Sequence, residues 1–346
     1  MTTTSYSLFC MGNPLLDMQV TNGESLLEKY KLKANDAILA GPEHMPIYDD
    51  IYKNHKITYV AGGAAQNAAR AAAYVLPPKS VVYTGCVGSD ALADQLRAAN
   101  EREDVASAYQ VKEGDETGAC AVVLTGHDRS LVTTLRAAEK FEESHLSSPE
   151  VAPLIDGAKM IYVGGFFLTH GVKSALALAK KASETGKTFA LNLSAPFICQ
   201  FFGAQLQQIL PYVDLLIGNE SEAAAWAGAN GLPTDAPLST IAKTLANLPQ
   251  ANPAHPRTVV ITSGADSTVV AKSGEETEPK VYPVAALPSS AIVDTNGAGD
   301  MFAGGFLGAT LLGKSVDEAV EVGHKLGAMC VGQIGPQLRF PKENVL

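Results

Sequence analysis

The chain has 346 residues, of which 46% are hydrophobic and 18% are charged, and this composition predicts a folded protein with a large buried core. Its net charge of −10 at pH 7 and the absence of any run of Lys and Arg argue against a nucleic-acid partner. No window reaches about 18 apolar residues and residues 1–10 lack a signal-peptide pattern, so we expect neither a membrane span nor secretion.

The cysteines show no metal-ligand or redox spacing and are odd in number, which is typical of a reducing compartment. They are Cys10, Cys86, Cys120, Cys199 and Cys330. We therefore expect a cytoplasmic protein and leave a nuclear location open.

Short β-rich segments alternate with longer amphipathic segments along most of the chain. We predict strands at residues 6–12, 80–87, 160–163, 188–193, 213–217 and 258–262. We predict helices at residues 64–74, 90–102, 172–185, 221–227, 238–247, 301–312 and 316–331. This alternation is typical of βαβ units, so we expect an α/β fold with a mainly parallel sheet and helices on both faces.

Two segments in the first half interrupt this alternation. Residues 117–135 read as two alternating strands around a turn at 126–129, and residues 18–60 combine polar turns with short strands. We expect them to form a small β-rich lid of about 16–61 and 110–138 within a single domain spanning 1–346. Segments rich in Pro, Gly or Glu are predicted to be solvent-facing connectors, at 230–237, 249–257 and 273–280.

The most informative segment is residues 294–300, Asp-Thr-Asn-Gly-Ala-Gly-Asp, which we expect to form a strand-to-helix turn after the apolar residues 291–293. Free backbone N–H groups at such a turn bind anions, because the first turn of a helix leaves them without partners. The residues that offer them are Gly297, Ala298 and Gly299. The turn therefore predicts a site for a phosphoryl group.

Asp300 ends this turn, where a carboxylate repels an anion unless it takes part in the chemistry. A kinase base that accepts the proton of an attacking hydroxyl is usually an Asp, and we assign this role to Asp300. Because a helix N-terminus lowers the pKa of a carboxylate, we expect Asp300 to be a weak base.

The turn matches neither of two other phosphate-binding motifs. A dinucleotide fingerprint needs G-x-G-x-x-G after the first strand, whereas this turn lies near the C-terminus and contains an acid. The P-loop pattern G-x-x-x-x-G-K-[ST] does not occur in the chain. We therefore expect a kinase without a P-loop.

A second glycine motif, Gly62-Gly63, precedes an Ala-rich helix that carries Asn67 near its start. Two glycines allow the backbone to approach a ligand closely, and the Asn67 amide points toward the same end of the helix.

Together these motifs resemble the two signatures of the ribokinase (PfkB-type) family of carbohydrate and nucleoside kinases. Further stretches are similar to its adenosine-phosphorylating members, at 12–17, 117–120, 192–197 and 218–222. The resemblance runs from residue 8 to beyond 330. It implies a ribokinase-like α/β core with a small lid, ATP as donor, Mg²⁺, and adenosine phosphorylated at its 5′-OH to AMP.

The resemblance and the residue types together give a predicted nucleoside site. Asp17 can accept hydrogen bonds from two ribose hydroxyls, and Asn13, Gly62, Gly63 and Asn67 are expected beside the sugar. A purine needs an apolar slot with few polar contacts. The candidates for that slot are Leu39, Cys120, Leu131, Leu135, Phe167 and Phe197.

The remaining predicted residues concern ATP and its metal. The resemblance implies that Arg129 reaches the transferring phosphoryl group when the lid closes, and that Asn219 and Glu222 orient Mg²⁺ through water without a direct ligand. It also implies further contacts with ATP from Thr262, Gly264, Asn296 and His324. A monovalent-cation site near Asp294 is compatible with the family.

Two alternatives stay open at this point. The first is a kinase of the same family that acts on a sugar or on another nucleoside such as inosine or guanosine, although the apolar lid face argues against a free sugar. The second is a catalytically silent nucleoside-binding protein, against which the intact Asp300 argues. We expect adenosine and ATP as the ligands and a monomer as the assembly.

Overall fold

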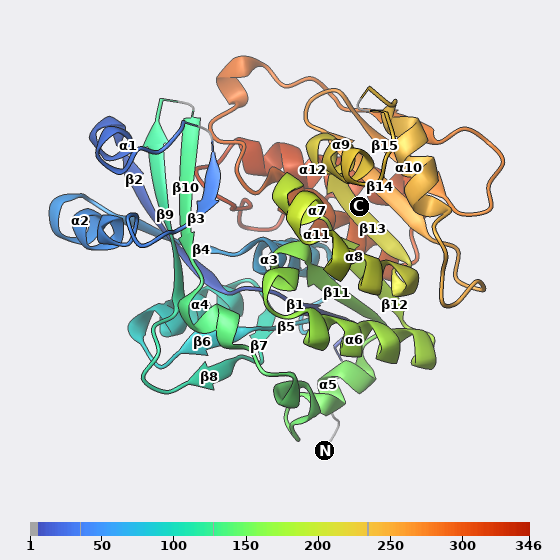
Figure 1. The fold of residues 1–346 in the computed structure, drawn as a ribbon, viewed down its shortest axis with the longest axis horizontal. Helices are drawn as coiled ribbons and strands as arrows, with labels where there is room; N and C mark the ends of the chain where they lie inside the picture. The colour runs from blue at the N-terminus through green and yellow to red at the C-terminus, as the bar shows by residue number, and fades with distance from the viewer. Residues whose placement is uncertain (1–5, 35, 127, 234) are drawn as a thin grey trace.

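A nine-stranded sheet forms the centre of the molecule in the computed structural model, which describes residues 6–34, 36–126, 128–233 and 235–346 (Figure 1). Its strands, in spatial order, are β16 (Lys280–Pro283), β15 (Ser267–Lys272), β14 (Thr258–Ser263), β13 (Leu215–Asn219), β12 (Thr188–Asn192), β11 (Met160–Gly164), β1 (Leu8–Met11), β5 (Val81–Thr84) and β7 (Val105–Ser107). The strands from β14 to β7 are parallel, and β15 and β16 pair antiparallel. The α/β class with a mainly parallel sheet is confirmed.

Helices cover both faces because successive residues of a buried strand point to opposite sides. In β1, Leu8 and Cys10 join the core on one face, and Phe9 and Met11 join the core on the other. The first face carries α3 (Ala64–Val75), α4 (Ala91–Arg102), α11 (Ala298–Leu311) and α12 (Val316–Val331). The second carries α5 (Ala152–Gly157), α6 (Val172–Thr185), α7 (Pro196–Phe201), α8 (Gly203–Ile209), α9 (Glu220–Ala229) and α10 (Leu238–Ala246).

Helices α3 and α11 pack unusually closely, and this contact positions the site. A Cβ on Gly304 would lie 2.2 Å from the carbonyl oxygen of Ala68, so only glycine fits there. Gly308 likewise faces Val75 and Ala72 of α3. The small residues of both helices therefore bring their N-terminal turns side by side.

A second sheet stands beside the first, with two helices on its outer side (Figure 1). Its strands, in order, are β3 (Ala37–Leu39), β10 (Asp128–Thr134), β9 (Gly118–Thr125), β2 (Leu15–Thr21) and β4 (Thr58–Gly62). The helices α1 (Glu24–Tyr30) and α2 (Pro46–Asn54) bury apolar side chains against one face of this sheet. A separate pair joins β6 (Cys86–Gly88) to β8 (Gln110–Lys112). The 3₁₀ helices are Arg136–Lys140, Glu143–Ser147, Gly165–Thr169, Leu210–Tyr212 and Ser289–Ala291.

Several predicted elements differ from the structure. The predicted strand 80–87 is two strands, β5 and β6, separated by Gly85, where an added Cβ would lie 2.4 Å from Gly12 O. Segment 18–60 contains helices α1 and α2 besides its strands, and segment 273–280 ends in the first residue of β16. The hairpin at 117–135 is confirmed as β9 and β10, although residue 127 of its turn lies outside the described residues.

The predicted connector 249–257 ends in Arg257, which is wholly buried and not solvent-facing. Its guanidinium donates to the backbone carbonyls of Leu210, Val213, Leu245, Leu248 and Pro249. These hydrogen bonds compensate for the burial of the charge.

Candidate active site

A cavity of about 680 Å³ lies where the carboxyl ends of the parallel strands meet the second sheet. In a sheet of this kind ligands bind outside the carboxyl ends of the strands. Asn192, Asn219 and Thr262 line the cavity from β12, β13 and β14. Asp17 and Leu131 line it from β2 and β10, on the face of the second sheet opposite to α1 and α2.

Asp300 and Asn67 meet at the floor of this cavity. They occupy the first turns of α11 and α3, which the glycine contacts of these helices bring together. Asn67 Nδ2 donates to Asp300 Oδ2 over 3.0 Å. Both predicted residues therefore lie in one site, with Asp300 partly exposed to the cavity.

The glycine turn has the form of an anion site, with two differences from expectation. Residues 291–293 are not a strand. The 3₁₀ helix Ser289–Ala291 ends there, and the chain then continues without regular structure. The N–H of Ala298 points back to Thr295 O at 3.4 Å, and Ala298 does not line the cavity. Within the described part of the chain, the N–H groups of Gly297 and Gly299 have no acceptor, and both residues line the cavity. These two amides are the ones available to a phosphoryl group.

Gly297 is required by both its backbone and its surroundings. Its φ is 76°, and an added Cβ would lie 2.5 Å from Pro336 Cβ. The C-terminal segment that contains Pro336 therefore packs directly against the turn.

Burial raises the pKa of three carboxyls that line the cavity. Desolvation raises the pKa of Asp300, of Asp17 and of Glu222 to about 7 in each case. The expectation of a lowered pKa for Asp300 is wrong, because the loss of hydration outweighs the hydrogen bond from Asn67 and the charge of Arg70. A base with a pKa near neutral pH is better suited to proton transfer than a weak one.

Asp17 lies inside β2 of the second sheet and not directly after the first strand. It is buried, and Gly62 leaves it room, because a Cβ there would lie 2.2 Å from Asp17 Oδ1. Gly62 itself does not line the cavity, whereas Gly63 and Asn13 do. Asn13 Oδ1 is bonded to Nε2 of His170 over 2.9 Å, a partner that the sequence did not suggest.

All six residues predicted for the apolar slot line the cavity, which supports a slot for a planar base. The aromatic rings differ in what they offer. Phe167 is fully buried against Phe141 and His170, so little of its ring is free. Phe197 is half-buried and lies 5.9 Å from Phe166, measured between ring centroids. Phe166 also lines the cavity and was not predicted.

The polar lining residues that were not predicted come from several elements and loops. They are Asp36, Thr133, Thr169, Asn192, Ser194, Gln200 and Thr295. Asn192 and Ser194 belong to the stretch 192–197, for which the sequence predicts a resemblance but no separate role. Polar residues at the carboxyl end of a parallel strand were the signal that could have identified them.

The residues predicted for ATP divide into two groups. Asn219, Glu222, Thr262 and Asn296 line the cavity. Asn219 and Glu222 also form a capping box, in which each side chain accepts the backbone N–H of the other over 2.9 Å.

Gly264 and His324 lie outside this cavity. Gly264 is exposed in the turn between β14 and β15, and His324 is bonded to Thr268 Oγ1 over 2.8 Å. A contact of either with ATP stays a prediction.

Arg129 is the second residue of β10 and is buried in an ion pair with Asp294. Asp294 also accepts the backbone N–H of Gly335 over 2.6 Å and that of Asn296 over 2.9 Å. Arg129 does not line the cavity, so its predicted contact with a phosphoryl group requires it to change partner.

Among the described residues, no group of three His, Cys, Asp or Glu side chains could hold a metal ion. Mg²⁺ commonly keeps several waters and binds through substrate phosphates. Glu222 and Asn219 line the cavity, and their predicted contact with Mg²⁺ through water stays a prediction. Over the same residues, no helix combines the length and the apolarity needed to cross a membrane.

Comparison with known proteins agrees with this geometry. The family described as pfkB family carbohydrate kinase matches residues 25–343. An adenosine kinase of Schizophyllum commune is 62% identical over 343 residues, which cover 99% of this chain and 100% of that protein. The structure of Anopheles gambiae adenosine kinase in complex with P1,P4-di(adenosine-5) tetraphosphate matches with a TM-score of 0.89 and 40% identity, over 94% of this chain and 95% of that one. Schistosoma mansoni adenosine kinase with 2-fluoroadenosine matches with a TM-score of 0.91 and 33% identity, over 97% and 98%.

Proposed function

The chain belongs to the pfkB family of carbohydrate kinases, and we propose that it transfers the γ-phosphoryl group of ATP to the 5′-OH of adenosine, giving AMP and ADP. The observation that carries this proposal is the cavity itself. Asp300, Gly297 and Gly299 line it together with the apolar residues of the predicted slot, and Asp17 lines it from the second sheet. Relatives that are adenosine kinases support the choice of acceptor.

In the proposed reaction Asp300 accepts the proton of O5′ as the bond from O5′ to the γ-phosphorus forms. The bond from the γ-phosphorus to the bridging oxygen breaks, and ADP leaves with the electron pair. The N–H groups of Gly297 and Gly299 stabilise charge on the transferring group. Asp17 holds the ribose hydroxyls, so that O5′ stays within reach of Asp300.

Mg²⁺ is the metal whose chemistry suits this donor set, and when bound it would neutralise part of the phosphate charge. Glu222 and Asn219 would hold its water. A monovalent cation near Asp294 stays a prediction. The Asp294 carboxylate already accepts from Arg129 and from the backbone N–H groups of Asn296 and Gly335. We further propose a cytoplasmic monomer, which fits the five free cysteines and an apolar wall that faces the substrate.

ADP release from Mg-ATP, measured in parallel with adenosine, inosine, guanosine, ribose and fructose, tests this function. We expect adenosine to be used best, because a slot lined by Leu39, Leu131 and Phe197 favours a purine over a free sugar. Preference for inosine or guanosine would reassign the acceptor within the nucleosides. Turnover with ribose alone would reject the nucleoside assignment, and no turnover with any acceptor would favour a silent binding protein.

We expect kcat/KM for adenosine to fall at least about tenfold for each pH unit below about 7. The base must be ionised to accept a proton, and desolvation raises the pKa of Asp300 to about 7. Lowering the pH through this value protonates Asp300 and removes the acceptor. Asp17 and Glu222, whose pKa values are also raised to about 7, steepen the fall.

The measurement is kcat/KM at saturating Mg-ATP, across about two pH units on each side of 7. Thermal stability recorded at each pH serves as the control for acid unfolding. A profile that stays flat down to about pH 5 would contradict the raised pKa or the role of Asp300 as base.

A further inference from the structure

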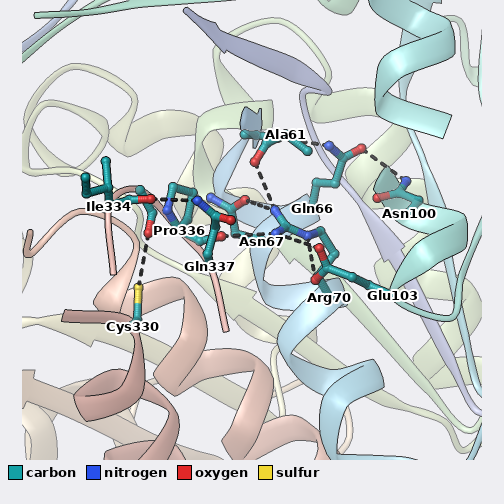
Figure 2. Close-up of polar contacts among 12 residues, drawn as sticks. Ala61, Gln66, Asn67, Arg70, Asn100, Glu103, Cys330, Ile334, Pro336 and Gln337 are labelled. Atoms are coloured by element: carbon teal, nitrogen blue, oxygen red, sulfur yellow. Dashed lines mark hydrogen bonds and ion pairs between the residues drawn. The ribbon is translucent and has the colours of Figure 1, made fainter. Parts of the chain in front are cut away.

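Arg70 is a buried cation on α3 that no step of the proposed reaction uses (Figure 2). Its side chain is 3% exposed and joins parts of the chain that are far apart in sequence. The guanidinium forms a two-point contact with Glu103, in which Nε donates to Oε2 over 3.0 Å and Nη2 lies 3.0 Å from Oε1. Arg70 also donates to Ala61 O over 2.9 Å and to Pro336 O over 3.1 Å.

One remaining contact of Arg70 reaches the site. Arg70 Nη1 donates to Asn67 Oδ1 over 3.2 Å, one helical turn away. A guanidinium has donors and no acceptor, so only the oxygen of the Asn67 amide can face it. The amide nitrogen must then point the other way, where it donates to Asp300 Oδ2. The contact with Arg70 therefore favours the orientation in which the Asn67 amide nitrogen meets Asp300.

The two backbone carbonyls that Arg70 contacts belong to segments that adjoin the site. Ala61 lies in β4 of the second sheet, one residue before Gly62, which makes room for Asp17. Pro336 lies against Gly297 of the anion turn.

We propose that Arg70 is a positioning residue for phosphoryl transfer, which holds the Asn67 amide toward Asp300. This inference rests on the proposed function, because Asp300 must be the base for the orientation of Asn67 to affect the rate. Glu103 holds the guanidinium by two contacts, which a lysine at position 70 could not reproduce.

Both the charge of Arg70 and its contact with Asn67 favour the ionised form of Asp300. Arg70 lowers the pKa of Asp300 and of Asp17, against the larger rise caused by desolvation. If the Asn67 amide turned over, its oxygen would face Asp300 and favour the protonated acid. The titratable or charged groups around Arg70 and Asp300 are Asp17, Glu103, Tyr109, Tyr162, Glu222 and Cys330.

A double-mutant cycle between Arg70→Met and Asn67→Ala tests this proposal. Loss of a residue that orients a group at the reaction centre commonly lowers activity by about 10- to 100-fold, and we expect that loss in kcat/KM for Arg70→Met. In the Asn67→Ala background, where no amide remains to be held, the same change should cost less than about threefold. The cycle is measured about two pH units above the acidic limb, so that protonation does not contribute.

The pH profile gives a second measure that a purely structural role would not change. In Arg70→Met the acidic limb of kcat/KM should move to higher pH, because Asp300 and Asp17 lose a neighbouring positive charge. The matched control is Arg97→Met on α4, whose guanidinium lies over the Tyr109 ring, 5.1 Å from its centroid. Arg97 is absent from the lining of the cavity, and we expect wild-type kinetics for its variant.

Equal losses from Arg70→Met in both backgrounds, with an unmoved acidic limb, would overturn the proposal. If Arg70→Met does not fold, Arg70→Lys completes the same cycle, because one ammonium cannot reproduce the planar fork. Turnover of adenosine by the wild-type protein distinguishes a failure of the proposed function from a failure of the role of Arg70. A wild-type protein that does not phosphorylate adenosine contradicts the proposed function, whereas an active one with additive variants contradicts only the role of Arg70.

Discussion

Replacement of Asp300 by Asn is expected to lower kcat for adenosine by about three orders of magnitude and to change adenosine affinity little. An amide has almost the shape of a carboxylate, so its oxygen can still accept from Asn67 Nδ2. It cannot take the proton of O5′. The measurements are kcat from ADP release and the Kd of adenosine from calorimetry.

Asp317→Asn is the matched control for this variant. Asp317 also lies in the first turn of a helix, α12, but it is exposed and paired with Lys280. We expect its kcat to stay within about twofold of wild type, because surface substitutions of this kind have small effects. A kcat for Asp300→Asn that matches this control would remove Asp300 from the mechanism.

Relative to wild type, Asp300→Asn should gain stability against unfolding as the pH rises. Desolvation raises the pKa of Asp300 to about 7 in the folded protein, far above its ordinary value. The contribution of this group to folding is therefore fully present at low pH and is lost as the pH rises toward 7. Above pH 7 the folded wild type carries a poorly hydrated charge that Asn lacks. We expect Asp300→Asn to be at least as stable there, so that lost activity is not lost folding.

The parts of the fold that follow local patterns were predictable from the sequence. Strands buried on both faces appear as short apolar runs, and Asp90 and Ser315 mark helix starts by accepting backbone N–H groups. The helices α1 and α2 were missed, since one has seven residues and the other begins at Pro46. A proline at the first position of a helix looks like a turn in the sequence.

Long-range contacts account for the rest of what the sequence did not reveal. The sequence predicts a connector at Arg257, because nothing near this residue in sequence indicates that the carbonyls of Val213, Leu245 and Leu210 surround it. The pKa of Asp300 was predicted with the wrong sign for the same reason. The helix N-terminus is a local feature, whereas desolvation depends on elements that pack from elsewhere in the chain. The role of Arg70 depends on contacts with Glu103 and Pro336, which are far from it in sequence.

Asp17 gives the second large expected effect, in recognition of the ribose. It is buried in the wall of the cavity, and no described residue donates a hydrogen bond to it. Its two oxygens are therefore free to accept from the 2′- and 3′-hydroxyls. A hydrogen bond to a charged group contributes about 1.5–3 kcal/mol, so we expect Asp17→Ala to lower kcat/KM for adenosine by at least about 100-fold.

Deoxynucleosides distinguish this explanation from general damage to the site. Wild type should use 2′-deoxyadenosine and 3′-deoxyadenosine each at least about tenfold less well than adenosine, because each lacks one donor to Asp17. Asp17→Ala should discriminate among the three by less than about threefold, since the acceptor is gone. The KM for ATP in the same variant is the control and should stay near the wild-type value. Undiminished discrimination by Asp17→Ala would place ribose recognition elsewhere, with Asn13 and Asn67, which also line the cavity, as the next candidates.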